Sequence, residues 1–222
     1  MKANSFTSGD WWAVVNVDQR RSRSSPDLVP DLLSRLESLE TALPPERTAG
    51  DEVQLITRSA NTVVTVLEEA ARGGAWRVGV GLGPVETPLP QTVRASRGPA
   101  FVAAREAVDA AHTSPSGLAF VMGEDPSGNV GGADYACRQR VQEAATVAAL
   151  LHHLWSRRTK EGWDVVDNVR ASGSGRAAAA ALGISASAVS QRLRTAGWQP
   201  GEQGRELLEQ ILAELLGEDG AR

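Results

Sequence analysis

Three acidic side chains, Asp18, Asp51 and Glu52, have the type and spacing to bind a cation. Asp18 follows the apolar run WWAVVNV, while Asp51 and Glu52 follow Gly50 and precede a second strand-like run. If these runs are neighbouring strands, the carboxylates meet at one edge of a sheet, where close like charges are costly without a cation. A hard divalent ion such as Mg²⁺, alone or with the phosphates of a nucleotide, binds such oxygens. Alternatively, the two aspartates are exposed turn residues.

A second group of polar residues lies in the segment LGISASAVSQRLRTAGW and has the chemistry for binding DNA. The apolar spacing predicts a helix over 186–195 with Val189 and Leu193 on one side. Its other side carries hydroxyl, amide and guanidinium groups, which read base edges and hold phosphates. We expect DNA contacts from Ser187, Ser190, Gln191, Arg192 and Arg194, with backbone contacts from Ser185 and Arg176. The alternative is a small helical domain used for protein contacts.

Two further helices are expected before this one, over 159–171 and 174–182. The second is alanine-rich and ends at Leu182-Gly183, and Ile184-Ser185 lead into the next helix cap. This is the order of a helix-turn-helix, in which the second helix of the pair lies in the major groove. We expect Val189 and Leu193 to pack against Leu182, Ile184, Trp163 and Val166.

The distribution of charge supports DNA binding although the whole chain carries a net charge of −4. Residues 156–200 contain seven Arg and Lys against three Asp and Glu, a net +4, and residues 201–222 carry −4. A basic island between acidic segments is typical of a DNA-binding module in an acidic protein. The N-terminus has no apolar signal core, no run is long enough to span a membrane, and Cys137 is the single cysteine. A cytoplasmic protein without membrane contact is therefore expected.

The first two thirds of the chain predict an α/β domain. Apolar runs near 11–17, 53–56, 76–85 and 117–123 favour strands, and helical spacing appears at 27–41, 59–71 and 98–111. A turn is expected at Pro44-Pro45. Short links between alternating strands and helices favour a mixed sheet covered by helices. Gly79 and Gly81 indicate close packing against a neighbour, with the approach of a ligand as the alternative.

The chain is therefore divided into an α/β domain at 1–134, a linker or dimerisation helix at 135–158, a helix-turn-helix domain at 159–200 and an amphipathic helix at 201–222. The apolar stripe of the last helix needs a partner, either the long helix of its own chain or that of a second chain. A homodimer would present two reading helices to a two-fold operator. His152 and His153 lack the ligand spacing of a metal site and are expected to be solvated or packed.

The order of four motifs resembles the class III nucleotidyl cyclase fold: an Asp after the first strand, GDE before the second, RVGVGLGPV, and GPAFVAAREA. Residues 11–123 resemble the SatD family more closely still, and members of that family often carry a helix-turn-helix afterwards. The segment LGISASAVSQRLRTAGW is similar to the helix-turn-helix of MarR-type and sigma-region-4-like regulators. The resemblance implies a ferredoxin-like mixed sheet with helices, followed by an all-α domain.

The same resemblance implies roles for individual residues. Asp18 and Asp51 take the positions of the cyclase metal ligands, Arg47 that of the base-reading residue, and Arg105 that of a phosphate-binding arginine. Phe101 stands where cyclases have the Asn that supports the transition state, and losing one such donor costs about 10²–10³ in rate. We therefore expect a DNA-binding transcriptional regulator whose α/β domain dimerises or senses a nucleotide-type ligand, such as a nucleotide second messenger, with Mg²⁺ as its cofactor. The alternative is a metal-dependent cyclase-like enzyme with an appended helix-turn-helix.

Overall fold

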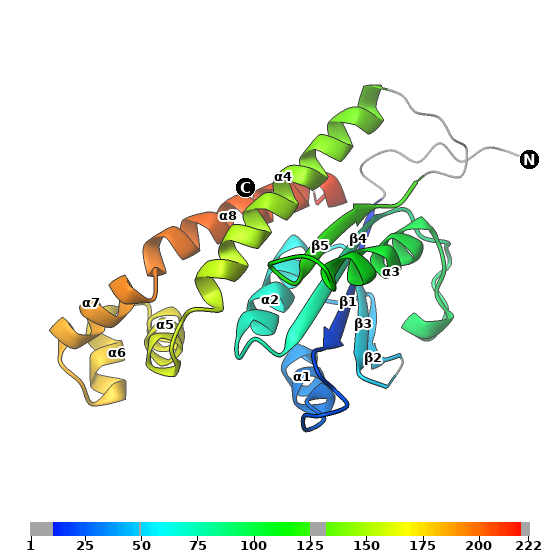
Figure 1. Cartoon of the computed structure of the whole chain (residues 1–222). Coiled ribbons are helices and arrows are strands. Elements are labelled where there is room, and N and C mark those ends of the chain that lie inside the picture. Colours follow the sequence, from blue (N-terminus) through cyan, green and yellow to red (C-terminus); the bar gives the residue numbers. More distant parts are fainter. Residues whose placement is uncertain (1–10, 49, 125–131, 219–222) are drawn as a thin grey trace, which may run out of the picture.

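A computed structural model describes residues 11–48, 50–124 and 132–218, with the side chains of 132–134 left out (Figure 1). Its centre is a mixed five-stranded sheet in the order β2-β3-β1-β4-β5, in which only β4 and β5 are parallel. The strands are β1 (Trp12–Gln19), β2 (Leu43–Arg47), β3 (Glu52–Thr57), β4 (Trp76–Gly83) and β5 (Leu118–Met122). The expected mixed α/β class is confirmed.

The alternation of side chains along the central strand β1 separates two cores. Val15 and Val17 lie on one face, where they join the main core with helices α1 (Val29–Leu36), α2 (Ala60–Ala71) and α4 (Gly132–Trp155). Val14 lies on the other face with Ile56 and helix α3 (Pro99–Ala111). Because successive side chains of a strand point to opposite faces, β1 contributes residues to both cores.

Helix α3 lies directly against the backbone of β4. A Cβ atom added to Gly79 would overlap the main chain of Val108, and one added to Gly81 would overlap Ala100 and Ala104. The two glycines therefore allow a helix to approach the sheet more closely than a side chain would permit. The packing interpretation of these glycines is confirmed.

Four helices complete the chain: α5 (Lys160–Ser172), α6 (Gly175–Leu182), α7 (Ala186–Thr195) and α8 (Trp198–Leu216). Side-chain oxygens of Thr159, Ser174 and Ser185 cap the first three by accepting a hydrogen bond from a backbone amide of the first turn. Helices α5, α6 and α7 surround a small core that includes Val165, Ala179 and Val189. Helix α8 returns to the sheet domain and packs on α4 and α2 (Figure 1).

Several expectations about this architecture need correction. The sequence predicted a turn at Pro44-Pro45, but both prolines lie in β2, at the edge of the sheet, where a missing backbone donor is tolerated. Val189 and Leu193 were expected to meet Trp163 and Val166, but Val189 packs with Val165 in the small core instead. Trp163 and Val166 belong to the main core, and Leu193 packs against both cores. Of the two partners considered for the last helix, the long helix of the same chain is the one observed.

Within residues 11–48, 50–124 and 132–218, no helix combines the length and apolarity needed to cross a membrane.

Candidate functional site

Asp18 lies at the end of β1 on the face covered by α3. It is paired with Glu52 across the strands, and its Oδ2 is 3.3 Å from Nη1 of Arg77 and 3.7 Å from Nε2 of His112 at the end of α3. The Asp18 side chain is 17% exposed. The sheet edge therefore holds this carboxylate in a partly buried position next to Arg77 and His112.

The pKa of Asp18 is raised above its ordinary value, first by burial and then by the negative charge of Asp51, while His112 and Arg77 act in the opposite direction. The Asp51 carbonyl accepts a hydrogen bond from the Gln19 amide at 3.0 Å, so Asp51 lies beside the end of β1. Mg²⁺ commonly binds through one or two carboxylates together with phosphates and waters, and the Asp18–Asp51 pair fits this pattern. Among the described residues there is no cluster of three acidic, His or Cys side chains that would hold a metal alone.

Of the other residues of the predicted nucleotide site, Glu52 lies opposite Asp18, whereas Arg47 and Arg105 lie elsewhere. Arg47 pairs with Val53, a main-core residue, so its side chain lies on the face opposite to Asp18, where Nη1 donates to Oδ2 of Asp27 at 2.8 Å. Glu52 accepts a hydrogen bond from Oγ1 of Thr48. The structure does not bring Arg47 to the carboxylate pair.

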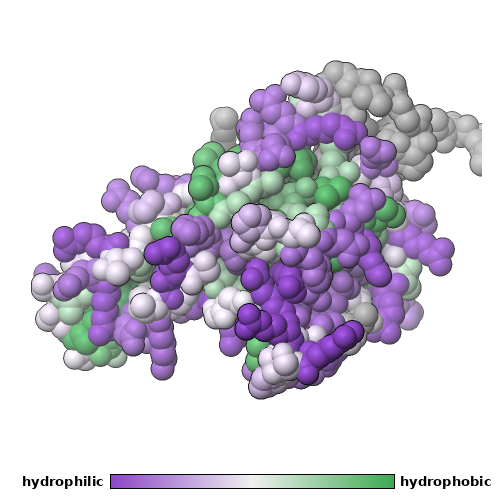
Figure 2. All heavy atoms as spheres, in the orientation of Figure 1, coloured by the Kyte–Doolittle hydropathy of each residue, from purple (hydrophilic) through white to green (hydrophobic). Residues whose placement is uncertain are grey.

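Arg105 is exposed on α3, seven residues before His112 and so about 10 Å from it along the helix axis. Together with Phe101 it lines a groove of about 1360 Å³ between α3, β5 and α4. Figure 2 shows hydrophobic surface beside α4 in this region. Phe101 and Arg105 therefore belong to a different surface from Asp18.

Helix α7 presents its polar residues to solvent. Val189 is 1% exposed and anchors the inner side of the helix, while the side chains predicted to contact DNA are exposed except for the half-buried Arg192. Ser185 caps the helix by accepting from the Ala188 amide, which leaves its hydroxyl hydrogen for another acceptor. The exposed members of the set are Arg176, Ser185, Ser187, Ser190, Gln191 and Arg194.

The basic residues of 156–200 divide into two groups. Arg158 and Arg170 turn inward to Glu68, whereas the other five lie on the surface of the three-helix unit α5–α7. Arg192 also lines a hollow of about 390 Å³ between α5 and α7, with Arg157 and Gln191. The cations on the surface are Arg157, Lys160, Arg176, Arg192 and Arg194.

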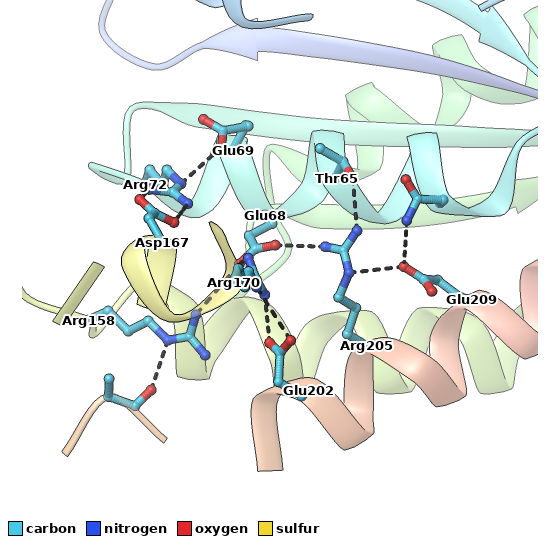
Figure 3. A network of polar contacts seen from close by, with 12 residues as sticks. Thr65, Glu68, Glu69, Arg72, Arg158, Asp167, Arg170, Glu202, Arg205 and Glu209 are labelled. Atoms are coloured by element: carbon cyan, nitrogen blue, oxygen red, sulfur yellow. Dashed lines mark hydrogen bonds and ion pairs between the residues drawn. The ribbon is translucent and has the colours of Figure 1, made fainter. Parts of the chain in front are cut away.

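A buried ionic network attaches the three-helix unit to the sheet domain (Figure 3). Its centre is Glu68 of α2, whose side chain is 4% exposed and accepts hydrogen bonds from Arg170 at 2.8 Å and Arg205 at 2.7 Å. Arg170 also donates to Glu202, and Arg205 forms an ion pair with Glu209. Helices α2, α5 and α8 are therefore connected through one carboxylate.

A second set of contacts surrounds Trp163 at the same junction. The guanidinium groups of Arg72 and Arg158 lie 4.0 Å and 4.6 Å from the centre of its ring. Arg72 also donates two hydrogen bonds to Asp167 at 2.7 and 2.8 Å, and Arg158 donates through Nε to the Ala196 carbonyl at 2.8 Å. These contacts fix the start of α5 and the end of α7 relative to α2.

Sequence reasoning missed this network, although one signal was present. In α2, Val64, Leu67 and Ala71 are buried at helical spacing, and Glu68 falls on the same side of the helix. A carboxylate on a buried helix face requires cationic partners. The partners themselves are 90 or more residues away in the sequence, so pattern alone cannot identify them.

Comparisons with protein-family models, with curated proteins and with solved structures found no match to this chain.

Proposed function

We propose that this chain is a DNA-binding transcriptional regulator in which α6 and α7 form a helix-turn-helix and α7 enters the major groove. The observation that carries this proposal is the division of α7 into an inner side anchored by Val189 and an outer side of exposed Ser, Gln and Arg residues. Such groups hydrogen-bond base edges and phosphates. The five cations on the surface of α5–α7 supply the attraction to the DNA backbone.

The proposal includes a ligand-sensing role for the sheet domain. Strands β1 to β4, in the sheet order β2-β3-β1-β4 with α1 and α2 as crossovers, have the order of a split βαβ fold, which supports the ferredoxin-like, cyclase-like assignment. Asp18 and Asp51 would hold Mg²⁺ that is completed by the phosphates of a nucleotide. When bound, the ion would neutralise the two carboxylates and orient those phosphates.

DNA binding is tested by selecting a preferred site from a random duplex library and measuring affinity for it by fluorescence anisotropy. Gln191→Ala and Arg194→Ala should each weaken specific binding by about 1–3 kcal/mol, the range for a side chain that reads a base. Gln203→Ala, an exposed glutamine of α8, is the matched control and should leave affinity unchanged. Equal affinity of all variants, or no enrichment of any sequence, would refute the proposal.

A second candidate function, a metal-dependent cyclase-like enzyme, is favoured by the proximity of Asp18 and Asp51. Incubation with ATP or GTP and Mg²⁺ or Mn²⁺ should then yield a cyclic product that Asp18→Asn abolishes. Phe101 weighs against this candidate because it lines the α3–α4 groove and offers no hydrogen bond to a ribose or to developing charge.

A homodimer also remains part of the proposal, since two copies of α7 would match a two-fold operator. The apolar side of α8 does not support a homodimer, because it is buried against α2 and α4 of the same chain. Sedimentation equilibrium with and without DNA measures the association directly.

A further inference from the structure

A cavity of about 650 Å³ lies between the C-terminal half of α4 and the loop that connects α3 to β5. Its lining includes Arg20, His152 and His153, together with several hydroxyl groups, and none of its lining residues is acidic. The hydroxyl and amide groups come from Ser114, Ser116, Gln142, Thr146 and Ser156. From these residues we infer that the cavity binds the phosphate group of a small phosphorylated ligand.

Arg20 is held in place by the fold, and His152 is buried. Arg20 Nε donates to the Trp76 carbonyl at 2.9 Å, and its Nη2 lies against Gly117, where a Cβ atom would collide with it. His152 is 6% exposed, and its Nδ1 has no hydrogen-bond partner among the described residues. A buried imidazole nitrogen without a partner is costly, and it indicates a ligand or water that completes the site.

The electrostatic surroundings favour an anion. The pKa of Arg20 is lowered by burial and by the nearby charges of Arg77 and Arg21. Burial, Arg20 and His153 lower the pKa of His152 to about 4, so at neutral pH its imidazole is uncharged. An oxyanion next to Arg20 offsets this excess of positive charge and accepts hydrogen bonds from its guanidinium group.

Three carbonyl groups in the last turn of α4 already accept hydrogen bonds. The His152 carbonyl accepts from the Ser156 amide at 2.9 Å, and the Trp155 carbonyl accepts from the Arg158 amide at 3.0 Å. Ser156 Oγ donates to the His153 carbonyl at 3.3 Å. Because these acceptors are occupied, the partial negative charge of the helix terminus is partly compensated.

The test is calorimetric titration of the full chain with inorganic phosphate and with ribose 5-phosphate, in a phosphate-free buffer containing a metal chelator. The chelator prevents metal-dependent binding at Asp18, so this experiment is independent of the proposed nucleotide site. Arg20→Gln and His153→Gln should each weaken binding at least tenfold, whereas Arg23→Gln, an exposed arginine outside the cavity, should change it less than twofold. Titration with sodium chloride controls for ionic strength.

Preference for ribose 5-phosphate would identify a phosphate ester as the ligand class, and equal binding would identify free phosphate; either supports the inference. His153 is exposed, so its variant remains informative if Arg20→Gln does not fold. The inference is overturned if neither compound binds, or if Arg23→Gln weakens binding as much as the two cavity variants.

Discussion

Glu68 and Arg158 lie 3.6 Å apart inside the protein, with side chains that are 4% and 0% exposed. Glu68 belongs to α2, and Arg158 belongs to the short connection between α4 and α5. Burial lowers the pKa of Arg158 to about 10, although the charge of Glu68 acts to raise it. The pair therefore joins the sheet domain to the three-helix unit at the cost of two desolvated charges.

Replacing Glu68 by Gln keeps the shape of the side chain and removes its charge, which leaves three arginines at the junction without their shared carboxylate. We expect the free energy of unfolding to fall by about 3–5 kcal/mol, as is typical when one partner of a buried ion pair is removed. Urea denaturation measures the change. Glu69→Gln, whose side chain is 20% exposed, should cost less than about 1 kcal/mol. Equal losses in the two variants would contradict this interpretation.

Stability should depend on pH through His152. Its pKa is lowered from 6.5 to about 4, so between these values the unfolded chain binds a proton that the folded protein does not. Stability is therefore lost as the pH falls from about 6.5 to 4, by about 3 kcal/mol from this residue. His152→Gln should flatten the pH profile in phosphate-free buffer. His153→Gln is the control and should retain most of the slope; identical profiles for wild type and His152→Gln would contradict the assignment.

The carboxylate pair can be tested by ligand linkage. A nucleotide with Mg²⁺ at a hundred times its Kd should raise the free energy of unfolding by about 2.7 kcal/mol, and Asp18→Asn should remove the gain. Without metal, Asp18→Asn should stabilise the protein, because burial and Asp51 disfavour the charged form of Asp18. Asp31→Asn makes the same charge change on the exposed side of α1 and should have neither effect. Thermal unfolding with and without Mg²⁺ and nucleotide measures both the gain from the ligand and the effect of Asp18→Asn alone.

Gly79→Ala should destabilise the protein by about 3 kcal/mol, because the added methyl group meets the backbone of Val108 rather than a movable side chain. Gly175→Ala is the matched control, since its methyl group would make an ordinary contact 3.6 Å from Val189 within α6. That change should be neutral or stabilising by about 0.4–1 kcal/mol. Thermal or urea unfolding of the two variants compares them; a tolerated Gly79→Ala would mean that α3 can move away from the sheet.

If Arg176 contacts the DNA backbone, Arg176→Gln should weaken binding similarly for all sequences and reduce the salt dependence of log K by about one. Arg35→Gln removes an exposed arginine of α1 and should leave the slope unchanged. Anisotropy titrations between about 50 and 200 mM salt measure both slopes. An unchanged slope for Arg176→Gln would place this residue outside the contact surface.

Local patterns predicted most of the helices and strands. The helix predicted over 186–195 agrees with α7, and the Ser and Gly residues around α6 and α7 mark their ends as expected from capping chemistry. The last helix begins at Trp198, before the boundary expected at residue 201, because Pro200 and Gly201 are accommodated in its first turn. β2 was missed because an edge strand tolerates prolines that local propensity assigns to a turn.

The candidate sites depend more on long-range contacts. The position of Asp51 and Glu52 beside the end of β1 was predictable from the ends of two neighbouring strands. The separation of Arg47 from them was not, because it depends on which face each residue of β2 presents. The Arg20–His152 cavity joins residues more than 130 positions apart, and nothing in the local pattern of either segment indicates the other.

Only Ala196 and Gly197 separate α7 from α8, and α8 is seated on α2 and α4 for much of its length. The proposed reading helix consequently has no flexible tether. To meet a duplex in the right orientation, the whole protein would have to rotate together with this helix. The direction in which the sheet domain projects from the DNA axis would then be fixed by the fold.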